Sequence, residues 1–142
     1  MMGSTVTHIT KKAECPILIL KDFQPRSKKD NESYNWVICT DGSEGSRRAF
    51  NSMSSLVNKD KDTVTVLAVK TEGFDTEKLE AHCKVGFEKQ GVKGSVVVLP
   101  FEVGKKIDTT LLEYIHDEKT PYVDFVSVRL DLSKDWTIWS EF

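Results

Sequence analysis

An aspartate and a serine stand in a short turn of this sequence and are well suited to hold a small polar ligand. Residues 36–39 are apolar, as in a strand buried on both faces, and Asp41-Gly42-Ser43 follows them directly. Side-chain oxygens of Asp and Ser cap helices by accepting hydrogen bonds from free backbone N–H groups. The carboxyl end of a strand is also where ligands bind in open α/β sheets. The sequence leaves both interpretations of Asp41 and Ser43 open.

Further apolar runs and amphipathic segments place this turn in an alternating strand–helix order. The other expected strands are residues 63–69, 95–99 and 122–128. Apolar residues recur at helical spacing between them: Ala49, Phe50, Met53, Leu56 and Val57, then Leu79, Cys83 and Phe87, then Val103, Ile107, Leu111 and Ile115. Asp75 or Thr76 can cap the second helix. Buried strands that alternate with helices predict a parallel sheet covered on both faces.

An additional helix–strand unit precedes these elements. Val6, Ile9 and Ala13 lie at helical spacing, and residues 16–20 form an apolar run that we expect to dock as an edge strand. The polar residues 22–34 read as a linker. The chain then divides into a terminal helix–strand segment, a linker, a main domain and a divergent tail, at residues 1–21, 22–34, 35–130 and 131–142.

The tail carries an unusual set of aromatic residues. Trp136, Trp139 and Phe142 are three apart, as on one side of a helical turn. They can cover an exposed edge of the core, or they can anchor an interface, because Trp is enriched in binding hot spots.

The composition predicts one soluble domain that binds neither nucleic acid nor an anionic membrane. The chain has 142 residues with a net charge of −2, which favours neither nucleic acid nor an anionic membrane. No apolar run is long enough to span a bilayer, and no signal peptide is apparent, so we expect a cytoplasmic protein. We interpret Cys15, Cys39 and Cys83 as reduced thiols. We expect no metal site, because the histidines lie on different elements, and no catalytic residues, so the chain is not expected to be an enzyme.

Two stretches resemble the universal stress protein family. The first is Val37-Ile38-Cys39-Thr40-Asp41-Gly42-Ser43-Glu44-Gly45-Ser46, followed by Ala49. The family opens with a strand, Asp-x-Ser and a helix that carries Ser and Ala. The second is Gly3-Ser4-Thr5-Val6, followed by Cys15-Pro16-Ile17-Leu18-Ile19-Leu20-Lys21. The family closes with Gly-Ser or Gly-Thr, a helix, Cys-Pro and an apolar strand. The resemblance implies an α/β fold of the adenine nucleotide alpha hydrolase-like type, with a five-stranded parallel sheet and helices on both faces.

The order of the two stretches differs from that of the family, because the closing segment comes first here. The chain is either a fragment of a tandem protein or a circular permutation. A linker of about 14 residues reaches at most ~46 Å, which is enough for the chain to close one fold on itself in either case.

The resemblance also implies where an adenine nucleotide would bind. It places Asp41 and Ser43 beside the nucleotide, Val69 at the adenine edge and Gly3-Ser4 at the phosphates, although Val69 also fits a core position. Nucleotide-binding members carry Gly-x-x-Gly after the fourth strand, whereas Arg129 and Leu132 occupy those positions here, with Asp131 between them. Without these glycines the backbone N–H groups cannot approach phosphate oxygens closely. We therefore expect weak or absent binding of ATP or AMP.

These observations predict a stress-response or signalling module that forms a homodimer through its Cys15–Leu20 strand. The alternative is an ATP- or AMP-binding, or slowly ATP-hydrolysing, universal stress protein whose site is completed by another chain. A third interpretation is a fragment with no independent role.

Overall fold

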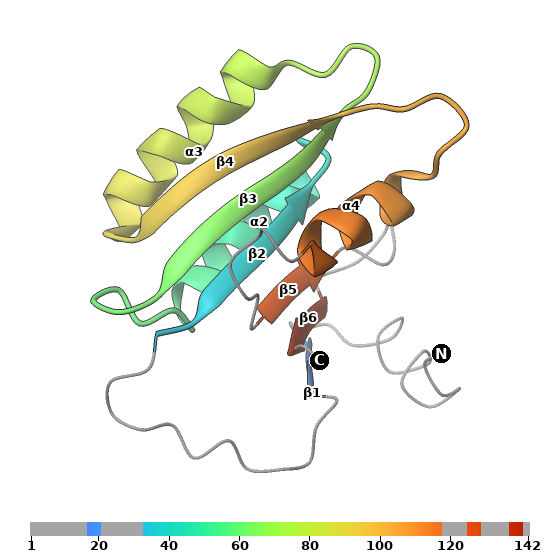
Figure 1. Ribbon diagram of the computed structural model, residues 1–142. Coiled ribbons are helices and arrows are strands. Elements are labelled where there is room, and N and C mark those ends of the chain that lie inside the picture. Colours follow the sequence, from blue (N-terminus) through green and yellow to red (C-terminus); the bar gives the residue numbers. More distant parts are fainter. Residues whose placement is uncertain (1–16, 21–32, 118–124, 129–136, 141–142) are drawn as a thin grey trace.

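The computed structural model describes residues 17–20, 33–117, 125–128 and 137–140, and Figure 1 draws their arrangement. The strands are β1 (Ile17–Leu20), β2 (Asn35–Thr40), β3 (Thr63–Lys70), β4 (Lys93–Pro100), β5 (Phe125–Val128) and β6 (Thr137–Ser140). The helices of this part of the chain are α2 (Glu44–Ser54), α3 (Thr76–Gln90) and α4 (Ile107–His116).

The strands form one sheet in the order β1-β6-β5-β2-β3-β4. Strand β2 lies inside the sheet and pairs in parallel with β3 and with β5, and β3 pairs in parallel with β4. Trp36 of β2 therefore stands beside Val64 on one side and Phe125 on the other. The predicted strands at residues 36–39, 63–69 and 95–99 each lie within an observed strand, and β5 covers the end of the fourth predicted strand.

The sheet has six strands and is mixed, in contrast to the five parallel strands we expected. The extra strand is β6, which pairs antiparallel with β5 and parallel with β1. The helical spacing that we read across the tail is wrong at residues 137–140, where the chain is extended. Thr, Ile and Trp all favour strands, and pairing there satisfies backbone groups along β5 that would otherwise lie at an edge. Trp136 and Phe142 lie outside the described residues. The expected edge position of residues 17–20 is confirmed.

Helices cover both faces of the sheet, as predicted for this fold class (Figure 1). On one face, side chains of α2 and α3 pack against β2 and β3, and Ile38, Met53, Val64 and Phe87 are buried there. On the other face, residues of α4 pack against Val37, Cys39 and Leu67. The α/β class is therefore established by the alternating order and by these two separate cores.

Three residues that we assigned to helical core faces, Leu56, Val103 and Ile107, are exposed. Helix α2 ends at Ser54, and the side chain of Leu56 beyond it is 50% exposed. The hydroxyls of Ser54 and Ser55 donate to the carbonyls of Asn51 and Ser52, three residues earlier, which competes with continuation of the helix. Val103 precedes α4 and is 95% exposed, so it is not a core residue.

Candidate functional site

The Asp41 turn lies at the carboxyl end of β2, where the chain changes direction across the sheet. From β2 the chain continues to β3 and β4 on one side, whereas β5 lies on the other side of β2. A crevice forms at such a switch point because the connections on the two sides diverge. Asp41 and Ser43 therefore occupy the place where an α/β sheet of this order binds ligands.

Both residues are engaged by the first turn of α2. The Oδ1 atom of Asp41 accepts a hydrogen bond from the backbone N–H of Ser43 at 2.9 Å and one from the hydroxyl of Ser46 at 3.2 Å. The Oγ atom of Ser43 caps α2 by accepting from the backbone N–H of Ser46 at 3.3 Å. The capping interpretation is confirmed for Ser43. Asp41 is not the capping residue but accepts hydrogen bonds from the same helix turn.

These contacts determine the charge of the turn. Partial burial of Asp41 by itself raises its pKa, but hydrogen bonds donated by Ser43 and Ser46 outweigh burial, so the pKa lies below its usual range. Asp41 is therefore ionised at neutral pH. An ionised carboxylate at this position can accept a hydrogen bond from a ligand hydroxyl, but it repels a phosphate group.

An aromatic ring that we did not predict lies against this turn. Gly42 has a φ of 78°, which favours glycine, and a Cβ atom added to it would lie 3.5 Å from Cε2 of Phe74. The backbone N–H of Phe74 donates to the carbonyl of Thr71 at 3.1 Å, which fixes the turn that follows β3. The sequence signal was present as Gly73-Phe74 in the turn shortly after a strand, at the same edge of the sheet as Asp41.

Val69 lies in the core beside this site, and the remaining predicted residues are not described by the structure. The side chain of Val69 is buried, and its carbonyl accepts the N–H of Thr71 at 3.0 Å. Gly3, Ser4, Arg129, Asp131 and Leu132 lie outside the described residues. The structure therefore brings together Asp41 and Ser43 and adds Phe74, while it places Val69 in the core.

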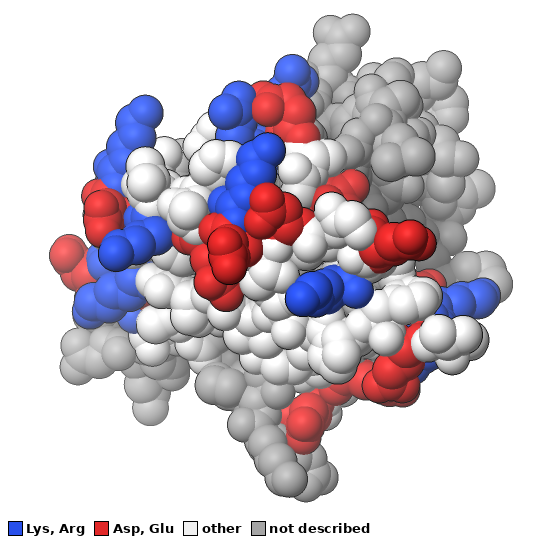
Figure 2. Space-filling model, turned by 90° about the horizontal axis from the view of Figure 1, so that it is seen from above, with Lys and Arg blue, Asp and Glu red and all other residues white. Residues whose placement is uncertain are grey.

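Charged groups of both signs lie side by side on one face of the described part of the molecule. Figure 2 shows Lys and Arg interspersed with Asp and Glu on the face seen from above. Lys105, in the loop after β4, forms an ion pair with Glu113 and another of 3.5 Å with Glu102. The hydrogen bond with Glu113 is the main cause that raises the pKa of Lys105. The ammonium group of Lys105 is thus already engaged by carboxylates.

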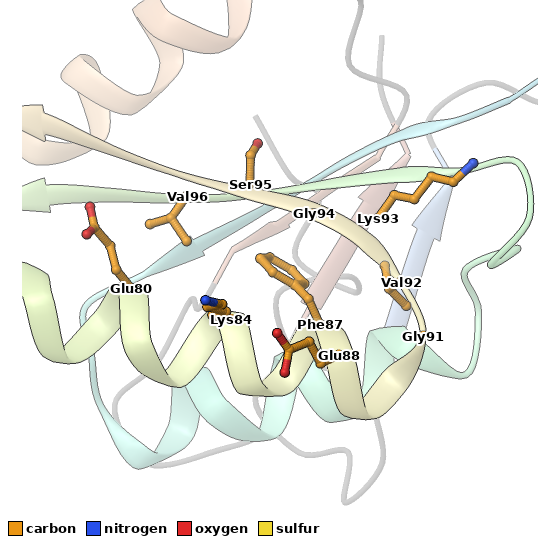
Figure 3. Close-up of a pocket in the computed structure, with 10 residues that line it drawn as sticks. All are labelled: Glu80, Lys84, Phe87, Glu88, Gly91, Val92, Lys93, Gly94, Ser95 and Val96. Carbon is orange, nitrogen blue, oxygen red and sulfur yellow. The ribbon is translucent and has the colours of Figure 1, made fainter.

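A hollow lies away from the Asp41 turn, between α3 and the first half of β4 (Figure 3). It is an open groove of about 530 Å³. Residues on its walls include Glu80, Lys84, Glu88, Lys93 and Val96, and Phe87 lies at its base. The sequence analysis did not predict this groove.

The described residues contain no helix long and apolar enough to cross a membrane. Within the same ranges, no three His, Cys, Asp or Glu side chains are grouped so that they could hold a metal ion.

Comparisons with known proteins give one distant structural likeness. No protein-family model matches the chain, and no curated protein matches it. A crystal structure of a protein from the universal stress protein family of Burkholderia pseudomallei superposes with a TM-score of 0.45 and 15% sequence identity. The match covers 56% of this chain and 70% of that one.

Proposed function

We propose that this chain is a universal stress protein-like stress-response or signalling module that binds adenine nucleotides weakly or not at all. In this proposal it acts in the cytoplasm as a homodimer and has no enzymatic activity of its own. The observation that carries it is the engagement of the Asp41 carboxylate by Ser43 and Ser46 of its own helix turn.

Three further features support weak nucleotide binding. The carboxylate of Asp41 is ionised and repels phosphates, and the carbonyl of Val69 already accepts a hydrogen bond from Thr71. In addition, the sequence has Arg129 and Leu132 where nucleotide-binding members of the family have glycines. A nucleotide at this turn would have to displace contacts that the fold already makes.

Calorimetric titration of ATP and of AMP into the full chain tests the proposal. We expect no dissociation constant below roughly 10 μM, which corresponds to about −6.8 kcal/mol. The matched variants are Asp41→Ala and Asp75→Ala, because Asp75 also accepts a backbone N–H at the start of a helix but lies outside the Asp41 turn. Sub-micromolar binding that is lost in Asp41→Ala and retained in Asp75→Ala would contradict the proposal.

One observation favours the alternative, an ATP- or AMP-binding or slowly ATP-hydrolysing protein. The ring of Phe74 lies against Gly42, and aromatic rings stack well on nucleobases. In this alternative a base lies on Phe74 and a ribose hydroxyl donates to Asp41. Phe74→Leu should then weaken AMP binding at least about tenfold, a factor equivalent to 1.4 kcal/mol. Phosphate release that increases with chain concentration would indicate a site completed by a second chain.

The proposed homodimer uses β1, which lies at an edge of the sheet. An edge strand leaves backbone N–H and C=O groups open to another chain, and pairing about a two-fold axis satisfies both copies at once. Residues Ile17 to Leu20 carry no charge that would oppose such pairing.

A further inference from the structure

Asp41 and Gly42 form a dipeptide of a chemically reactive kind. The sequence contains one Asp-Gly pair, at residues 41 and 42, and no Asn-Gly pair. Both residues are exposed in the turn between the end of β2 and the start of α2. Glycine has no Cβ atom that would shield its backbone nitrogen, so this nitrogen can reach the side-chain carboxyl of the preceding aspartate.

The reaction open to such a pair is closure of a five-membered imide ring. The backbone nitrogen of Gly42 attacks Cγ of Asp41, so that an N–Cγ bond forms and the Cγ–OH bond of the protonated carboxyl breaks. The hydroxyl and the amide proton leave together as water. Water then opens the ring at one of its two carbonyls: opening at Cγ restores aspartate, whereas opening at the main-chain carbonyl gives isoaspartate. The sequence of steps needs water alone and no cofactor.

The folded turn engages both reacting groups in other contacts. The backbone N–H of Gly42 donates to Oγ1 of Thr40 at 3.0 Å. The Oδ1 atom of Asp41 accepts from the backbone N–H of Ser43 and from the hydroxyl of Ser46. Ring closure consumes the N–H of Gly42 and draws Cγ of Asp41 toward it, so all three hydrogen bonds oppose it. Asp41 is also ionised at neutral pH, and a carboxylate loses an oxygen far less readily than the protonated acid does.

Two of these three contacts depend on the start of α2. Ser43 is the N-cap of the helix, and Ser46 is 4% exposed in its first turn. The hydroxyl of Ser46 also lies 2.7 Å from the carbonyl of Ser43, so its one proton is shared between that carbonyl and Asp41. The protection of Asp41 therefore lasts only while this helix turn is formed, and helix ends open more readily than helix centres.

We propose that Asp41-Gly42 is a site of isoaspartate formation that the folded start of α2 protects and that reacts when this turn opens. The product differs from the native turn in its backbone. In isoaspartate the main chain runs through Cβ and Cγ of residue 41, and the free carboxylate is attached to Cα. Cγ becomes a backbone carbonyl, so the carboxylate that accepts from Ser43 and Ser46 is lost from its place. Transient opening of the turn is thus converted into a lasting chemical change.

This inference goes beyond the proposed function, because it involves neither a nucleotide nor a second copy of the chain. Its experiment contains no nucleotide, so its failure and the failure of the proposed function are distinguishable. The full chain is aged at neutral pH, both native and unfolded in guanidinium chloride. The protease Asp-N cleaves before aspartate and not before isoaspartate, and electron-transfer fragmentation of the resistant peptide locates isoaspartate at residue 41. We expect formation at least about tenfold faster in the unfolded chain than in the native chain.

Two substitutions remove single protective contacts. Thr40→Val removes the acceptor of the Gly42 N–H and keeps a β-branched side chain, and Ser46→Ala removes the hydroxyl that reaches Asp41. Each should raise the rate in the native chain at least about threefold, as expected for the loss of one hydrogen bond. Each rate is divided by that of the same variant when unfolded, which removes any effect of the substitution on the intrinsic reactivity of the pair.

Ser54→Ala is the matched control. The hydroxyl of Ser54 also donates within α2, to the carbonyl of Asn51, but at the other end of the helix. This variant should age as the unmodified chain does. Urea unfolding of every variant separates local from global opening, because a local effect raises the rate without an equivalent loss of global stability.

The proposal is overturned if isoaspartate at residue 41 forms equally fast in the native and the unfolded chain, or if the unfolded chain forms none. It is equally overturned if Thr40→Val and Ser46→Ala leave the native rate unchanged, or if Ser54→Ala raises it as much as they do.

Discussion

The indole Nε1 of Trp36 donates a hydrogen bond of 3.1 Å to Oδ2 of Asp62 inside the molecule, where both residues are buried. The same carboxylate accepts the backbone N–H of Tyr34 at 2.8 Å and that of Asn58 at 2.8 Å. Asp62 therefore joins the start of β2 to the loop between α2 and β3. Because β2 leads directly to Asp41, this contact helps to position the candidate site.

Replacement of Asp62 by Ala should lower the free energy of unfolding by roughly 2–5 kcal/mol, because one buried and two partly buried donors lose this buried acceptor. Urea denaturation measures the change. Asp60→Ala is the control, because Asp60 is an exposed carboxylate two residues away, and it should change stability by less than about 0.5 kcal/mol. Equal effects of the two substitutions would show that the buried hydrogen bonds contribute little.

The contact between Gly94 and Phe87 predicts a pair of coupled substitutions. Gly94→Ala should destabilise the chain by roughly 1–3 kcal/mol, because the new Cβ would overlap the ring of Phe87. Phe87→Leu alone should also destabilise it, through loss of buried ring surface. The double variant should lose clearly less stability than the two single losses combined. Thermal unfolding of all four proteins checks this, and strict additivity is the outcome that contradicts it. Ser95→Ala is the neighbouring exposed control.

Ile19→Lys should remove the association step that uses β1, because a lysine on an edge strand opposes strand pairing. Sedimentation velocity at several concentrations measures the effect. Ile107→Lys is the control, because Ile107 is 44% exposed on α4, and it should sediment as the unmodified chain does. If the unmodified chain and the Ile19→Lys variant show the same association, β1 is not an interface.

The two described cysteines should react slowly with thiol reagents. Burial raises the pKa of Cys39 to about 12 and that of Cys83 to about 11. They belong to opposite cores and are both free thiols. At pH 8 only about 0.1% or less of either thiol is ionised, so labelling in a Cys15→Ser variant should be far slower in the folded than in the unfolded state.

The same shifts predict how stability depends on pH. Both folded-state pKa values lie above the ordinary value of 9.0, so the neutral thiols contribute fully below about pH 9, and this contribution declines as the pH rises toward 11 and 12. Urea unfolding at pH 8 and pH 10 measures the decline. A Cys39→Ala, Cys83→Ala double variant should show a smaller dependence on pH over that interval, and an unchanged dependence would contradict the assignment.

The order of strands and helices could be predicted from the sequence because it depends on local patterns of residues. Residues 63–69 and 95–99 are apolar, β-branched runs typical of strands, and Asp75 caps α3 as its position before a helical pattern indicated. The same applies to the Asp41 turn, whose capping role depends on residues only a few positions apart. Hydrophobic periodicity, helix-capping residues and turns all depend on residues close together in the chain, so the sequence alone is enough to predict them.

Tertiary structure decided the features that depend on distant partners. Strand β6 is four residues long, and it exists as a strand through pairing with β5 and β1 on either side. The burial of Asp62, which directly follows the charged residues Lys59, Asp60 and Lys61 in sequence, depends on donors from Trp36 and Tyr34 more than 20 residues away. The groove along β4 arises where α3 packs over Gly94 beside an edge that no local pattern marks. An edge and a groove are defined by which elements lie next to one another, and hydrophobic periodicity within each element carries no information about that.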